Sequence, residues 1–143
     1  MEFVKRITLE QCKAVSEYIF KRPVEENRKP IAIAITDQAA NLIFVAHMDG
    51  IHTRGGEIAR AKAFTAARMH RTTLNLREYC IENNAELAMF ACPGVTSMPG
   101  GTPIYNEEGT LIGGVGISGW SAAEDQMLAD ACAEFLLKQM QNH

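Results

Sequence analysis

Near the N-terminus, apolar residues recur at the three- and four-residue spacing of a helix. Residues 8–11 have the sequence of a capping box, and Cys12 and Ile19 fall on one face of the helix that would follow. The pattern predicts a helix from there to about Phe20. We expect Pro23 to end it, because proline lacks the N–H that a helix interior uses.

Further along, short apolar runs in two pairs, each pair joined by a polar turn, predict two β-hairpins. The first pair is 31–36 and 42–46, and the second is 102–105 and 110–117. In the first turn, Asn41 suits a left-handed position, which its short side chain tolerates.

A fifth apolar run, 87–91, predicts one more short strand. Helices are predicted over 57–71 and 74–83, and a last helix follows the capping-box sequence at 121–124. Strands linked as hairpins favour an antiparallel sheet with helices packed on it. We therefore expect one α+β domain over residues 1–143.

Charge and hydropathy narrow the function classes. The formal net charge of -3 gives no broad basic field, so we expect neither a nucleic acid nor an anionic membrane as a partner. No apolar run approaches the ~20 residues that span a bilayer, and residues 1–6 lack the apolar stretch of a signal peptide. We expect a cytoplasmic protein.

The cysteines, Cys12, Cys80, Cys92 and Cys132, form no C-x-x-C pair, and no histidine lies near them at zinc-ligand spacing. We expect free, buried thiols, with Cys92 structural as well.

Residues 114–119 read Gly-Val-Gly-Ile-Ser-Gly, the G-x-G-x-x-G of dinucleotide-binding folds. Such a fold needs a second parallel strand with an acid about 20 residues further on, and only one helix and a short tail follow here. The glycines instead indicate that another group approaches a strand closely. A tightly packed helix and a bound ligand both remain open.

The chain resembles the GlcG/HbpS family, which also includes the C-terminal domain of PduO-type proteins. The matching stretches run in family order over nearly the whole chain: Ile35-Thr36-Asp37, Asn41-Leu42, Met48-Asp49-Gly50, Ala61 to Ala66, Pro99 to Ile104, Gly113 to Gly119 and Glu124-Asp125. The resemblance implies a profilin-like α+β fold and higher homo-oligomers. Some members bind haem, and some are encoded beside glycolate, glycerol or propanediol pathways that use cobalamin. His47 stands where an arginine is common, which changes a charge near the expected pocket.

Lys62 lies on the same helical face as Ile58 and Thr65, so it points toward the sheet. Such a lysine either extends its ammonium to solvent or lies at a pocket floor, where it holds an anionic ligand or acts as acid or base. Asp125, in the first turn of the last helix, is either an acid favoured by the helix dipole or the partner of Lys62 or of a ligand. Thr65 would line the same pocket.

Glycine at positions 100, 101 and 119 would let backbone amides approach a carboxylate or phosphate. Ser118 would add a hydroxyl. Asp49 either stabilises a turn or forms part of the pocket mouth.

Haem iron could be ligated by Tyr18, His47, His52, His70 or a methionine, and the sequence does not choose among them. His47 and His52 with Asp49 leave a metal geometry unconstrained, so we predict no metal site.

The residues predict a five-stranded antiparallel sheet flanked by helices, and the resemblance implies that this domain is profilin-like and homo-oligomeric. We expect it to bind a small ligand between the Lys62 helix and the Gly-rich loop and strand, as an accessory protein of a glycolate, glycerol or propanediol pathway. Haem or a corrinoid is a candidate ligand, although the cofactor is not fixed by the sequence. The alternative is an enzyme acting on a small hydroxy- or keto-compound, with Lys62 and Asp49 or Asp125 in acid–base roles.

Overall fold

The computed structural model describes residues 5–142. Residues 1–4 and 143 lie outside it. The expected absence of a signal peptide rests on residues 1–6, most of which therefore lie outside the described residues. The elements follow in this order: α1 (Leu9–Glu25), β1 (Ala32–Asp37), β2 (Leu42–His47), α2 (Gly55–Met69), α3 (Thr73–Glu82), the 3-10 helix η1 (Leu87–Phe90), β3 (Gly101–Tyr105), β4 (Leu111–Ser118) and α4 (Ala122–Gln141).

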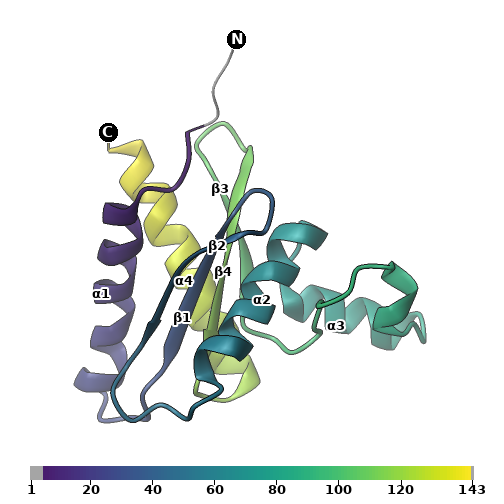
Figure 1. The fold of residues 1–143 in the computed structure, drawn as a ribbon, viewed down its shortest axis with the longest axis horizontal. Helices are drawn as coiled ribbons and strands as arrows, with labels where there is room; N and C mark the ends of the chain where they lie inside the picture. Colours follow the sequence, from purple (N-terminus) through teal and green to yellow (C-terminus); the bar gives the residue numbers. More distant parts are fainter. Residues whose placement is uncertain (1–4, 143) are drawn as a thin grey trace.

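The strands form one antiparallel sheet in the order β2-β1-β4-β3. This confirms the α+β class and both predicted hairpins. The sheet has four strands, so the prediction of five is wrong: residues 87–91 form η1 and its left-handed end at Ala91. That segment follows α3 away from the sheet, as Figure 1 shows, so no strand edge is available for it to pair with.

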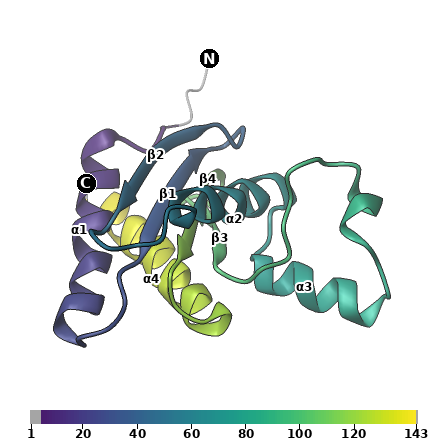
Figure 2. The ribbon, with the colours of Figure 1, turned by 60° about the horizontal axis from the view of Figure 1, so that its bottom comes forward.

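Helices cover both faces of the sheet (Figures 1 and 2). On one face, α1 and α4 pack on large aliphatic side chains of β1 and β4, such as Ile33, Ile35 and Ile117. On the other face, α2 packs on small residues, with Ala32 and Ala34 of β1 against Ala59 and Ala63 of the helix.

Glycines in β4 let α2 approach the sheet more closely than any side chain would allow. A Cβ added at Gly114 or Gly116 would collide with the backbone carbonyl of Ala63 or Ala59. The glycine-rich run of the sequence therefore serves helix-on-sheet packing, the first of the two interpretations that the sequence left open.

The helix boundaries follow local signals except at proline. Capping boxes at Thr8 and Ser121 begin α1 and α4, as predicted. The expectation that Pro23 ends the first helix is wrong, since α1 continues to Glu25 with Pro23 buried in its last turn. A proline that close to the end removes one hydrogen bond without stopping the chain from completing the turn.

The first turn also differs from expectation, because its left-handed residue is Ala40 and not Asn41. The Asp37 carboxylate accepts hydrogen bonds from the backbone N–H groups of Ala39 and Asn41, and this holds the loop in place.

Along residues 5–142, none of the helices combines the length and apolar content that crossing a bilayer requires.

Candidate functional site

Lys62 and Asp125 form a buried ion pair. The Lys62 Nζ lies 3.1 Å from Asp125 Oδ2 and donates a second hydrogen bond, of 2.8 Å, to the backbone oxygen of Ile117. The two residues are 1% and 3% exposed. The predicted pairing of these residues is confirmed, and the ammonium does not extend to solvent.

Lys62 passes between the two helical layers beside Gly100, which precedes β3, and beside Ile117, near the end of β4. Lys62 starts on α2, on one face of the sheet, and Asp125 belongs to α4, on the other. A Cβ at Gly100 would lie 2.8 Å from Lys62 Nζ and 2.7 Å from the Ile117 oxygen. Gly100 has a φ of 130°, in the left-handed region that favours glycine. Only glycine at this position leaves room for the lysine.

Burial dominates the electrostatics of this pair. It lowers the pKa of Lys62 and raises the pKa of Asp125, since a low-dielectric interior disfavours both charged forms. The partner's charge acts in the opposite direction on each group. Asp125 has further support, because its Oδ1 accepts a 2.9 Å hydrogen bond from the backbone N–H of Trp120. Each of the two buried charges is therefore compensated by the other.

Other predicted ligand groups are satisfied by the protein itself. The Ser118 hydroxyl donates to the backbone oxygen of Gly55. The Thr65 hydroxyl donates to Ala61 and accepts from the backbone N–H of Thr96, which fastens the long loop before β3. Their role as ligand contacts stays a prediction.

Gln126 is a part of the site that sequence reasoning missed. Its Oε1 accepts hydrogen bonds from the backbone N–H groups of Gly100 and Leu74, and its Nε2 donates to the Thr102 hydroxyl and to Asp130. This side chain joins α3, β3 and α4 beside the ion pair. Adjacency to Asp125 was the only signal for it in the sequence.

The remaining candidates do not join this cluster. Asp49 is exposed in the turn after β2, and His47, His52 and His70 are also exposed. Within residues 5–142, no three His, Cys, Asp or Glu side chains are grouped as a metal ion would need. The acid–base role of Lys62 with Asp49 or Asp125 stays a prediction.

A polar hollow of about 550 Å³ opens at the Gly119 end of the site. Its lining residues are Asn27, Arg28, Lys29, Gly119, Trp120, Ser121 and Glu124. The Arg28 guanidinium lies 3.7 Å above the Trp120 ring and pairs with Glu124. The hollow lies directly outside the ion pair, because Trp120 both lines it and binds Asp125. We call it the Trp120 hollow.

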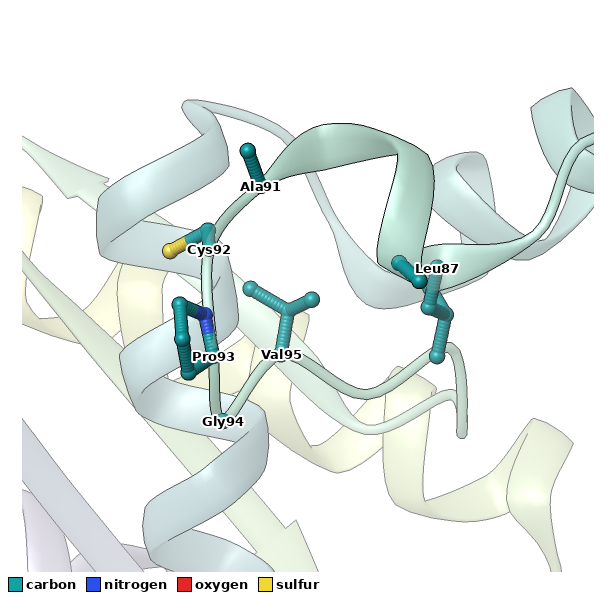
Figure 3. Close-up of a pocket in the computed structure, with 7 residues that line it drawn as sticks. Leu87, Ala91, Cys92, Pro93, Gly94 and Val95 are labelled. Atoms are coloured by element: carbon teal, nitrogen blue, oxygen red, sulfur yellow. The ribbon is translucent and has the colours of Figure 1, made fainter.

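A second, mainly apolar hollow of about 380 Å³ lies on the projecting segment between α3 and β3. Figure 3 shows its lining, residues 87, 88 and 91–95, with Cys92 among them.

Cys12 and Cys132 are buried free thiols, as predicted, whereas Cys80 and Cys92 are only half-buried. In their part of the chain, α3 buries only Thr73 and Leu76, and η1 buries none of its residues, so both thiols are covered only in part.

Comparisons of the sequence identify related proteins. Residues 7–134 match the family model described as haem degrading protein HbpS-like. Protein GlcG of Escherichia coli strain K12 is 34% identical over 94 residues, which cover 66% of this chain and 68% of GlcG.

Solved structures share the fold. The crystal structure of HbpS has a TM-score of 0.80 and 24% identity, over 94% of this chain and 92% of that one. The crystal structure of the PduOC:haem complex has a TM-score of 0.78 and 23% identity, over 92% of this chain and 95% of that one.

Proposed function

The chain belongs to the HbpS-like family, and on this ground we propose that it is a haem-binding accessory protein. The observation that carries the proposal is that a structure of the same fold, the PduOC:haem complex, holds haem. From the resemblance described in the sequence analysis we further propose that the accessory role belongs to a small-metabolite pathway of the glycolate, glycerol or propanediol type.

We place the ligand at the Gly119 end of the Gly-rich strand. No residue of the Lys62 helix or of the Gly100-Gly101 loop lines the hollow there, so the ligand would lie outside the position that the sequence predicted between them. The Trp120 hollow opens there, and its volume of about 550 Å³ falls in the usual range of ligand pockets. Lys62 and Asp125 lie beneath its floor and hold Trp120 in position through the Asp125 carboxylate.

The chemistry of the hollow suits a planar ligand that carries carboxylates. Arg28 covers one face of the Trp120 ring and pairs with Glu124, so a ligand stacked on that face would displace the guanidinium from the ring. Arg28 and Lys29 would then offer cations for propionate groups. The lining contains no His, Cys, Met or Tyr, so in this position the iron would receive no protein ligand from the hollow. Bound haem would supply redox-active iron, and the chain would bind and orient the macrocycle.

The test is a titration of the purified protein with haemin, followed by the Soret absorbance. We expect a saturable shift with one haem per chain. Hydroxocobalamin, titrated in the same way, separates haem from the corrinoid alternative. A chain that bound hydroxocobalamin but gave no saturable Soret shift would contradict the haem proposal.

A further inference from the structure

The Arg28 guanidinium lies in the Trp120 hollow with two of its sides occupied. It covers the Trp120 ring, with its central carbon 3.7 Å from the ring centroid. Its Nη2 lies 2.6 Å from Oε2 of Glu124. A ligand that stacks on this ring face, or that binds the cation through a carboxylate, therefore meets a position that the chain itself already fills.

Glu124 is held in place for this contact. It stands in the first turn of α4, and its Oε1 accepts a 2.7 Å hydrogen bond from the hydroxyl of the N-cap residue Ser121. The hydrogen bonds from Ser121 and Arg28 lower the pKa of Glu124. The carboxylate is therefore ionised at neutral pH and positioned before any ligand arrives.

The Trp120 ring is fixed independently of Arg28. Its Nε1 donates a 2.7 Å hydrogen bond to the backbone oxygen of Lys29, and the backbone N–H of the same residue binds Asp125. The side chain also packs against the core cluster that α1 and α4 form on the sheet. Uncovering the ring therefore needs a movement of the Arg28 side chain alone.

We propose that the Arg28–Glu124 contact is a latch that closes the Trp120 hollow, and that Glu124 thereby selects the ligand. A ligand with both an aromatic plane and a carboxylate opens the latch. Its carboxylate replaces that of Glu124 on Arg28, and its plane takes the ring face that the guanidinium leaves. A neutral aromatic compound offers the displaced guanidinium no new partner, so it binds much more weakly. This selection rests on the proposed role of the Trp120 hollow as the ligand site and makes Glu124 its specificity-determining residue.

The charges of the hollow suit this exchange. All of its lining lies within residues 5–142, with Arg28 and Lys29 as its cations and Glu124 as its one carboxylate. When the ligand takes Arg28, Glu124 keeps the hydrogen bond from Ser121, and its side chain is 36% exposed to water. The exchange therefore leaves neither carboxylate buried without a partner.

Benzoate and benzamide test this selection, since they share the aromatic plane and only benzoate carries the charge. Trp120 is the single tryptophan of the chain, so a change in tryptophan emission reports on this ring alone. We expect benzoate to change the emission saturably and benzamide to do so much more weakly. Equal responses to the two compounds would overturn the selection of a carboxylate.

Glu124→Gln opens the latch without disturbing the start of α4, because glutamine also fits the third position of a capping box. A neutral amide holds the guanidinium less strongly than a carboxylate does. Benzoate should therefore bind about two- to fivefold more tightly. Arg28→Ala should weaken benzoate binding, whereas a purely structural role of the ion pair would shift both variants in the same direction.

Glu26→Gln is the matched control, because it removes the same charge beside the same arginine. Glu26 Oε1 lies 4.0 Å from Arg28 Nη1, and Glu26 also pairs with Arg22, so it holds the Arg28 guanidinium less closely. The control should change the benzoate affinity less than Glu124→Gln does. Equal gains would trace the effect to net charge and overturn the latch. These titrations contain no haemin, so a failure of haem binding and a failure of the latch are separate results.

Discussion

The path of the Lys62 side chain through the interior determines which residues can lie beside it. Lys62 can reach Asp125 only past the bare Cα of Gly100, and it ends on the Ile117 oxygen and the carboxylate. A buried pair of this kind adds little net stability when intact, but losing one partner leaves an uncompensated charge in the interior. The pair therefore fixes the relative position of α2 and α4 more than it raises the stability of the fold.

Replacing Lys62 by methionine should lower the free energy of unfolding by about 3–5 kcal/mol, because Asp125 is then buried without a partner. The double variant Lys62→Met/Asp125→Asn should lose less than Lys62→Met alone, since Asn keeps the acceptor for Trp120 and carries no charge. Urea unfolding of both variants measures the difference. A double variant less stable than Lys62→Met would show that the cost does not come from the buried carboxylate.

The stability of Lys62→Met should also depend on pH. Burial raises the folded-state pKa of Asp125, and without the ammonium it rises further, whereas in the unfolded chain it stays near ~4. The folded state then holds the proton more tightly, so the stability is greatest at low pH and is lost as pH rises through the raised pKa. Unfolding at pH 5 should show a smaller deficit relative to the unaltered protein than unfolding at pH 8. Equal deficits would contradict this assignment.

Among the elements, contact between α2 and β4 requires glycine on the strand. The backbone of the helix rests on Gly114 and Gly116, so the position of Lys62 depends on how closely α2 approaches. A single methyl group added there has no flexible neighbour to displace, because the atoms that it would meet belong to the helix backbone.

Gly116→Ala should therefore lower the free energy of unfolding by about 1–3 kcal/mol through overpacking. Gly56→Ala is the matched control: its added Cβ meets the end of the exposed His47 side chain, which can move, and alanine favours the helix. Thermal unfolding of the two variants should separate them clearly. If both lost the same stability, close packing of α2 on β4 would not be the reason for the glycine.

The sequence predicted elements whose signals are local. Both hairpins and the capping boxes at Thr8 and Ser121 could be recognised because a few neighbouring residues determine them. The helical faces made the pairing of Lys62 with Asp125 one of several alternatives, and the structure selects it. The strand expected at 87–91 failed because a strand needs a partner edge, which depends on distant parts of the chain. The hydrogen bonds of Gln126 are equally non-local.

At the level of the whole molecule, the features that concern function lie apart from one another. The Lys62–Asp125 pair and the Trp120 hollow lie at the Gly119 end of the sheet. The second hollow, with Cys92, lies on the segment that projects beside α3 in Figure 1. This separation lets variants distinguish where haem binds, because a change in one hollow leaves the other intact.

The most direct measurement is the haemin affinity of two variants compared with the unaltered protein. Arg28→Ala removes a cation from the Trp120 hollow and should weaken haemin binding about tenfold, the effect of roughly 1.4 kcal/mol. Cys92→Ala, in the other hollow, should leave the affinity unchanged, and so should Arg60→Ala, which removes an exposed arginine of α2. If Cys92→Ala abolished the Soret shift while Arg28→Ala did not alter it, the ligand would lie in the second hollow and the placement proposed here would be wrong.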